Sequence, residues 1–241
     1  MGFQRHDGRA RRAVLLLLLA AAAVFGLFCA AGAWRERQID TDELLFDALA
    51  DAAAWQSYRY TLASSLLLNN YRTAETALRG DVRDDDLRVI GKLLNTEIDV
   101  FKSGGSLCRY DGAVGGYARL DDCPEITAPL LRTVLYPAVN LGFEDVVSVR
   151  FLGRIRVGGR KYYRYDVVPK DGFHILGAGF GDFEYKIDVN PKNRRVAAAS
   201  FAAKAETPRQ NRLTLKVRFF DVNGDFSVEL PENAVPVRGT D

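Results

Sequence analysis

The chain has 241 residues, of which 48% are hydrophobic and 27% are charged, and its formal net charge at pH 7 is +2. These values suit one globular domain of ordinary composition with its own hydrophobic core. So small a charge gives no support for a nucleic-acid-binding protein, and two histidines and three cysteines restrict the available catalytic and metal-binding chemistry.

The N-terminal segment has the pattern of an export leader. It begins with four basic side chains: Arg5, Arg9, Arg11 and Arg12. An uncharged run from Ala13 to Ala33 follows, and about 20 apolar residues suffice to cross a bilayer. Basic residues before such a run keep the N-terminus cytoplasmic and predict that the rest is exported. Two outcomes are open: the run remains as a membrane anchor, or cleavage occurs after Ala31-Gly32-Ala33.

One amphipathic helix is predicted after the leader (1–33) and a short linker (34–40). Asp40 or Thr41 can cap its N-terminus, and the helix is expected to end near Trp55. Its apolar residues recur at helical spacing: Leu44, Leu45, Ala48, Leu49 and Ala52. Such a face needs a sheet to cover, and the downstream strands supply one.

Most of the remaining chain has the period-two alternation of half-exposed antiparallel strands. The first predicted strands are Ser57–Leu68, Thr73–Val82, Leu87–Leu94, Thr96–Lys102, Ser106–Tyr110 and Tyr117–Asp121. The pattern is clearest in Val146–Pro231, where Tyr163, Tyr165 and Val167 alternate with polar side chains. In the first strand of that stretch we expect the apolar residues on one face: Val147, Val149, Phe151, Ile155 and Val157. Its arginines (Arg150, Arg154 and Arg156) are expected on the other face. These arginines and Arg218 could meet lipid headgroups, a partner or simply solvent.

Three segments depart from this pattern. Pro124–Asn140 is predicted to be helical, with interruptions at its prolines, and Asp171–Gly181 is a glycine-rich insertion. Ala197–Ala205 is predicted as a strand that is rich in alanine and poor in bulky side chains, and Phe226–Leu230 as the last strand. Small side chains leave volume unfilled, so the alanine-rich strand is expected to line a cavity.

The cysteines predict a covalent link rather than a reactive site. Cys108 and Cys123 flank a predicted hairpin, and in an exported domain a pair of cysteines is most simply a disulfide. Two thiols without histidine partners make a poor metal site. Cys29 follows the apolar run, but Phe28 stands where a lipidation signal has a small residue, so acylation of Cys29 is not expected.

Catalytic chemistry is not indicated. His174 is the one histidine outside the leader, and no nucleophile is placed to work with it. Gly177–Gly181 leads into a strand rather than a helix, so it does not form a dinucleotide-binding turn. We therefore predict a non-enzymatic protein with no cofactor and no metal. A glycan-cleaving carboxylate pair from distant strands is a weaker alternative.

Three stretches have a recognisable pattern: Trp55-Gln56-Ser57-Tyr58 at the helix-to-strand junction, the segment Phe101–Tyr110, and the end of the chain at Phe219–Asn223 and Phe226–Pro231. Together with the order of the elements, over roughly residues 40 to 231, they resemble the LolA/LolB and LppX/LprG class of lipoprotein carriers. The sensor RseB has a similar fold. The resemblance implies a half-open barrel that takes acyl chains between its sheet and its helices.

The expected fold is α+β: a strongly curved antiparallel sheet, or incomplete β-barrel, with helices on its concave face. It should occupy residues 41–232, with a polar tail at 233–241. We expect an extracytoplasmic binding protein for lipid or acylated protein, with no nucleic-acid partner; the alternative is a membrane-tethered sensor or interaction module for a protein partner. The expected cavity residues are Val149, Phe151, Tyr163, Tyr165, Tyr185, Ala198, Ala202 and Leu215.

Overall fold

The computed structural model describes residues 40–69, 71–123, 129–143, 145–170, 180–205 and 211–236. The chain divides into two compact units, Met1–Thr41 and Asp42–Asp241. The buried apolar residues that the structure describes lie in the second unit. The predicted leader, its cleavage site and Cys29 lie outside the described residues. Within the described ranges, no helix is long and apolar enough to span a membrane.

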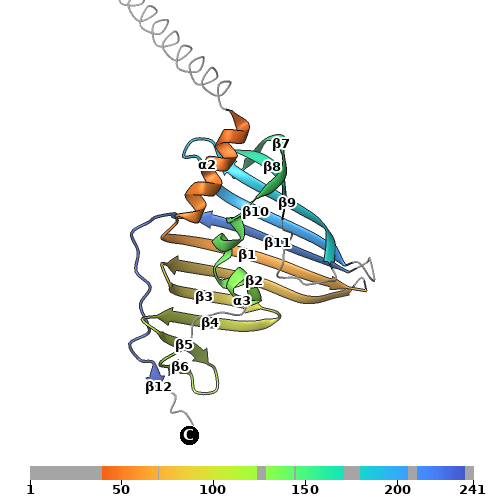
Figure 1. Cartoon of the computed structure of the whole chain (residues 1–241). Helices are drawn as coiled ribbons and strands as arrows, with labels where there is room; N and C mark the ends of the chain where they lie inside the picture. The colour runs from red at the N-terminus through yellow and green to blue at the C-terminus, as the bar shows by residue number, and fades with distance from the viewer. Residues whose placement is uncertain are drawn as a thin grey trace, which may run out of the picture. The chain divides into compact units, whose positions relative to one another are not determined.

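One antiparallel sheet dominates the second unit (Figure 1). Its twelve strands in the described residues follow the spatial order β12-β6-β5-β4-β3-β2-β1-β11-β10-β9-β8-β7. Because β7 and β12 are edge strands that do not pair with each other, the sheet is open. The strands are β1 (Ser57–Leu68), β2 (Tyr71–Arg83), β3 (Asp86–Leu93), β4 (Thr96–Ser103), β5 (Ser106–Asp111), β6 (Gly116–Leu120), β7 (Val146–Val157), β8 (Arg160–Pro169), β9 (Phe180–Asn190), β10 (Arg195–Ala205), β11 (Arg212–Phe220) and β12 (Val235–Pro236).

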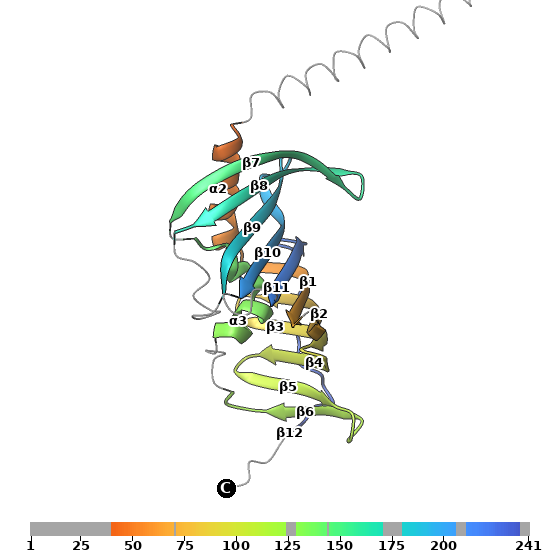
Figure 2. The same ribbon diagram turned by 90° about the vertical axis from the view of Figure 1, so that its right-hand side faces the viewer.

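In the part of the chain that the structure describes, few helices accompany this sheet. They are α2 (Thr41–Ala53), α3 (Pro129–Leu135) and the 3₁₀ helix η1 (Pro137–Leu141). Figure 2 shows α2 and α3 on the same side of the sheet, which we call the inner face; the opposite side is the outer face. The predicted open, curved sheet with helices on one face is therefore confirmed.

Helix α2 packs on the inner face through the apolar stripe that its sequence predicts. Leu44, Leu45 and Ala48 are completely buried, and full burial of a leucine side chain stabilises a fold by roughly 1.5–3 kcal/mol. At the C-terminal end of the helix, the ring of Trp55 packs edge-on against Phe219 of β11 at a centroid distance of 5.1 Å. Helix α2 is thus attached to the sheet by apolar contacts.

The second helical cover, α3 with η1, is held by a tyrosine from the sheet. The Tyr60 hydroxyl of β1 donates hydrogen bonds to the carbonyl oxygens of Val134 and Leu135, at 3.3 and 2.9 Å. These carbonyls lie at the end of α3, where backbone acceptors have no partner within the helix. Leu135 and Leu141, which belong to this segment, are also buried. The segment that we predicted to be helical therefore covers β1 and its neighbours.

A bulge in β7 changes which side chains face inward. The pairing of β7 with β8 shifts register between Phe151 and Gly153, and Gly153 has a φ of +117°, which few other residues adopt. Because a shift of one residue reverses the faces of a strand, Arg154 lies on the same face as Tyr163, with its guanidinium 5.3 Å from the tyrosine ring centroid. Ile155 instead pairs with Tyr162 on the outer face. The prediction of uninterrupted alternation in this strand was wrong.

The end of the chain also differs from the prediction. Phe226–Leu230 is not a strand; it is an extended segment in which the Phe226 carbonyl accepts a hydrogen bond from Arg83 and the Phe226 ring contacts Arg59. The sheet instead gains β12, which pairs in parallel with β6. Arg83 and Arg59 therefore contact this segment where the prediction placed a strand.

The expected bridge between Cys108 and Cys123 is absent from the structure. Cys108 is completely buried on β5, whereas the Cys123 backbone N–H donates to the Gly105 carbonyl at the β4–β5 turn. Three residues of extended strand separate Gly105 from Cys108, a distance of about 10 Å. A disulfide requires two Cα atoms within about 7 Å, so this pairing places the thiols too far apart.

Candidate functional site

Six of the eight expected cavity residues lie on the inner face. Residues that are paired across neighbouring strands point to the same face. Tyr165 is paired with Phe151 and Ile187, and Phe201 is paired with Tyr185 and Leu215. Tyr185 and Ile187 are two residues apart on β9, so both groups share one side of the sheet. The six residues are Val149, Phe151, Tyr163, Tyr165, Tyr185 and Leu215. The strand register therefore brings together residues that are up to about 65 positions apart in the sequence.

The two alanines of the expected cavity lie on the other face. Ala202 pairs with Glu184 and Thr214, whereas its neighbour Phe201 pairs with Tyr185. Ala198 pairs with Asp188 and Arg218 and lies on the same outer face. Alanine occurs on both faces of β10, so composition alone did not show which alanines face inward. The structure thus separates Ala198 and Ala202 from the other six residues.

Aromatic side chains fill much of the inner face between β7 and β10. The Phe151 ring lies 5.4 Å from the Tyr163 ring and 5.5 Å from the Tyr165 ring, measured between centroids. Tyr185 packs in the same way against Phe143 and Phe201, at 5.3 and 5.2 Å. Burial raises the pKa of Tyr185 well above its usual range. The three tyrosines are therefore core, whereas Phe151 on the edge strand β7 is 36% exposed.

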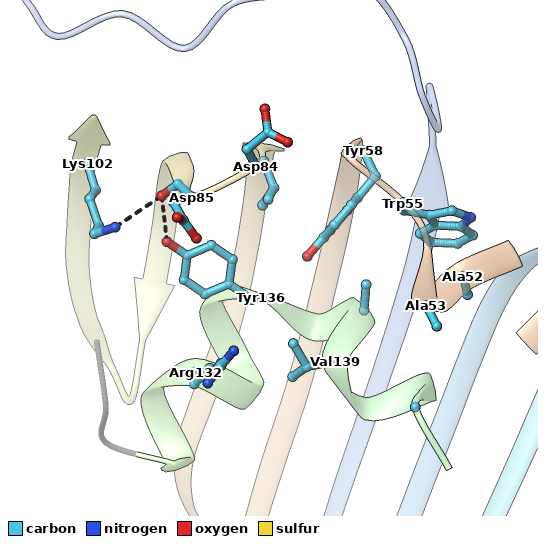
Figure 3. Close-up of a pocket in the computed structure, with 13 residues that line it drawn as sticks. Ala52, Ala53, Trp55, Tyr58, Asp84, Asp85, Lys102, Arg132, Tyr136 and Val139 are labelled. Atoms are coloured by element: carbon cyan, nitrogen blue, oxygen red, sulfur yellow. Dashed lines mark hydrogen bonds between the residues drawn. The ribbon is translucent and has the colours of Figure 1, made fainter. Parts of the chain in front are cut away.

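An open pocket remains between the two helical covers (Figure 3). It lies where the C-terminal end of α2, the α3–η1 segment and the ends of β1, β2 and β4 meet. Its volume is about 330 Å³, which is within the range of about 300–1,000 Å³ that small-molecule sites occupy. The residues that line it are Ala52, Ala53, Trp55, Tyr58, Val82, Asp84, Asp85, Lys102, Arg132, Tyr136, Ala138, Val139 and Gly142.

The pocket wall is mainly apolar and aromatic. Trp55 and Tyr58 come from the α2–β1 junction, and their ring centroids lie 5.8 Å apart. Tyr58 is almost completely buried; its burial raises the pKa of its hydroxyl far above the usual range, so this group is neutral at physiological pH. Val139 of η1 is exposed and lines the same space. An apolar ligand can therefore contact the wall without meeting a charge there.

Polar groups form one side of the pocket, and most of them are bound to the protein itself. The Asp85 carbonyl oxygen accepts two hydrogen bonds, one from Lys102 Nζ at 3.1 Å and one from the Tyr136 hydroxyl at 3.0 Å (Figure 3). The Lys102 side chain is buried apart from 9% of its surface. Arg132 of α3 is exposed beside them. Two cations and two aspartates line this side, so it is close to neutral overall.

Comparisons with known proteins identify the fold but not a family. No family model matches the chain, and no curated protein matches its sequence. Among solved structures, the chain is similar to lipoprotein LppX of Mycobacterium tuberculosis, with a TM-score of 0.53 and 12% identity over 79% of this chain and 100% of that one. It has an LppX-like fold. LprF of Mycobacterium bovis is similar to the same degree, with a TM-score of 0.53 and 12% identity over 78% of this chain and 95% of that one.

The likeness confirms the resemblance to the LolA/LppX class that the sequence indicated, as a statement about fold. None of the residues that line the pocket of this LppX-like domain was among the expected site residues. Two of its residues, Trp55 and Tyr58, do belong to the helix-to-strand junction that carried the resemblance, and this was the available signal. Lys102 likewise belongs to the segment Phe101–Tyr110, which also carried it. The residues of α3 and η1 reach the pocket because these helices lie over the sheet. Within the described ranges, no group of three or more metal-binding side chains is present.

Proposed function

We propose that this LppX-like domain is a non-enzymatic, extracytoplasmic binding protein that takes a lipid or the acyl part of a lipoprotein at its inner face. The observation that carries the proposal is the apolar pocket of about 330 Å³ between the two helical covers. It is a hollow in the inner face of the open sheet, between the two helical covers.

The shape of the covers supports this proposal. Helices α2 and α3 cover different strands, and the pocket lies between them rather than beneath either one. A long apolar chain that entered here would lie against Trp55, Tyr58 and Val139. Burial of each methylene group would contribute about 0.8 kcal/mol, so the affinity would increase with the length of acyl chain that the pocket accepts. The entry could widen by movement of η1, which is short and whose Val139 side chain is 45% exposed.

The polar side of the pocket supports a role in binding rather than catalysis. Lys102 and Tyr136 already donate to the Asp85 carbonyl oxygen and so hold the β2–β3 turn near α3. Arg132 and Lys102 lie beside Asp84 and Asp85 at the edge of an apolar wall, which suits a ligand with a polar head group of no net charge and an apolar tail. The export leader that the sequence predicts would deliver the domain to the cell envelope, where such ligands are present.

Native mass spectrometry tests the proposal. The segment Trp34–Asp241, which contains the whole compact unit Asp42–Asp241, would be produced in an exporting bacterial host and weighed before and after extraction with organic solvent. We expect an additional mass of lipid size that the extraction removes. The fragmentation of the released molecule would identify its class.

One pocket variant and two control variants locate the ligand. Val139→Trp places a large ring in the pocket and should reduce the bound fraction at least about fivefold, because the ring occupies space that an acyl chain needs. Val114→Trp makes the same change at a residue that is 74% exposed in the β5–β6 turn and does not line the pocket. Ala202→Leu enlarges a side chain on the outer face. Both controls should retain the ligand.

A domain that carries no extractable lipid, and that acquires none after incubation with envelope lipids, contradicts the proposal. That result would favour the interaction module for a protein partner, in which the same pocket accepts a side chain. A ligand that remains bound in Val139→Trp at the wild-type level would place the site elsewhere on the inner face.

A further inference from the structure

A second pocket lies on the outer face of the sheet, on the side opposite the helices. It has a volume of about 370 Å³, which again falls within the range of about 300–1,000 Å³ for ligand sites. Its walls come from the β7–β8 hairpin end, at Gly158, Arg160 and Tyr162, and from the outer faces of β10 and β11, including Arg218 and Phe220. Figure 2 shows this hairpin extending beyond the neighbouring strands.

The hairpin that forms one wall is strongly basic. From Val146 to Tyr165 the sequence has no acidic residue. The basic residues in this stretch are Arg150, Arg154, Arg156, Arg160, Lys161 and Arg164. Like charges on neighbouring strands repel one another, so such a hairpin is less stable than a neutral one unless anions lie close to it.

Two of these arginines have carboxylate partners on the outer face. Arg150 Nη2 lies 2.6 Å from Asp166 Oδ2. Arg164 makes a two-pronged contact with Asp188, with nitrogen–oxygen distances of 2.7 and 2.8 Å. Asp188 is the one acidic side chain among the described residues that line the pocket, and Arg164 already binds both of its carboxylate oxygens.

The pocket therefore contains two arginines whose charges are not compensated within the described parts of the chain. Arg160 and Arg218 both line it, both are exposed, and neither has an ion-pair partner among the described residues. They come from β8 and β11, which are not adjacent strands. The strand order and the hairpin thus bring two guanidinium groups from distant positions to one concave surface, beside the aromatic rings of Tyr162 and Phe220.

We propose that this outer-face pocket binds a phosphate ester through Arg160 and Arg218. The planar guanidinium group presents paired donors that match two oxygens of one phosphate, and two such groups can hold a phosphate monoester or diester together. Tyr162 and Phe220 would contact the organic part of the ligand. This site is separate from the inner-face pocket, so it does not depend on the proposed lipid site. The same chemistry occurs in phospholipid head groups and in soluble phosphate esters.

Binding to two probes tests the proposal and separates these sources. The segment Trp34–Asp241 would be titrated with glycerol 1-phosphate by calorimetry, and would be sedimented with phosphatidylcholine vesicles that contain phosphatidylglycerol. Because salt screens such contacts, both measurements belong at low ionic strength. If the domain binds glycerol 1-phosphate saturably but not the vesicles, the ligand is a soluble phosphate ester. If it binds the anionic vesicles, the ligand is a lipid head group. Either result supports a phosphate site.

The double variant Arg160→Ala/Arg218→Ala should weaken binding at least about tenfold, since each lost charge-assisted contact is among the stronger hydrogen bonds in proteins. The control Arg79→Ala/Arg212→Ala removes the same charge from two exposed arginines that do not line the pocket, and should bind nearly as wild type. Arg160→Lys/Arg218→Lys retains the charge without the paired donors and should lie between them. No binding of either probe, or an equal loss in the control, would overturn the proposal.

Discussion

The ring of Tyr60 on β1 lies directly over Gly80 on β2, in the space that a Cβ atom at residue 80 would need. The same tyrosine is completely buried, and its hydroxyl holds the end of α3. Glycine at this position therefore allows a large aromatic ring to lie across the neighbouring strand and reach a helical cover. One small residue in the sheet thus determines how α3 attaches to it.

Gly80→Ala is expected to destabilise the domain by about 1–3 kcal/mol, because the added methyl group overlaps the Tyr60 ring in a packed core. Urea denaturation followed by circular dichroism measures the change. Gly112→Ala is the matched control, since a Cβ atom there meets nothing within 4 Å. Equal stability of the two variants would show that the Tyr60 ring is free to move.

Leu45→Ala is expected to lower the free energy of unfolding by about 2–5 kcal/mol, because it leaves a cavity beneath α2. Leu45 is completely buried, whereas the adjacent Phe46 is 49% exposed. Phe46→Ala should therefore change stability by less than about 1 kcal/mol. Chemical denaturation of both variants provides the comparison. A small effect of Leu45→Ala would mean that α2 is not a tightly packed cover.

The stability of the domain should fall at alkaline pH. Burial raises the pKa of Tyr58, Tyr60 and Tyr185, so these hydroxyls stay neutral in the folded state. In the unfolded chain they ionise near pH 10. The contribution of these hydroxyls to the free energy of unfolding is complete below that pH. It is lost as the pH rises from about 10 towards the raised pKa of the folded state, because over this range only the unfolded chain releases protons.

Ultraviolet absorbance of tyrosinate, recorded together with circular dichroism from about pH 9 to about pH 12, checks this prediction. Part of the absorbance change from the ten tyrosines should coincide with unfolding. Tyr58→Phe should make that late component smaller. Complete ionisation of all tyrosines while the circular dichroism remains native would contradict the burial of these rings.

The two cysteines of Trp34–Asp241 should differ in reactivity towards a thiol reagent. Cys108 is completely buried and burial raises the pKa of its thiol, so little thiolate is available in the native state. The Cys123→Ser variant should therefore react only on unfolding, whereas Cys108→Ser should react in the native state through its half-buried Cys123. An intact mass two hydrogens lower than that of the reduced chain would instead show that the predicted disulfide forms.

The sequence by itself determined the secondary structure with good accuracy. The predicted strand Ser57–Leu68 coincides with β1, and the buried stripe of α2 contains the five residues expected from helical spacing. These features depend on local periodicity: side chains alternate in a strand and recur every three or four residues in a helix. The resemblance to the LppX fold followed from the order of those elements, because that order restricts how one sheet can be assembled.

Tertiary structure decided where strand faces depart from simple alternation and which residues meet in the pockets. A bulge at Gly153 moves Arg154 to the inner face, and strand pairing places Ala198 and Ala202 on the outer face. Neither feature is visible in a periodic pattern, since one added residue reverses every side chain that follows it. Both pockets likewise join residues from distant segments, such as Trp55 with Val139 and Arg160 with Arg218. Their proximity depends on long-range strand pairing and helix packing, which local sequence does not contain.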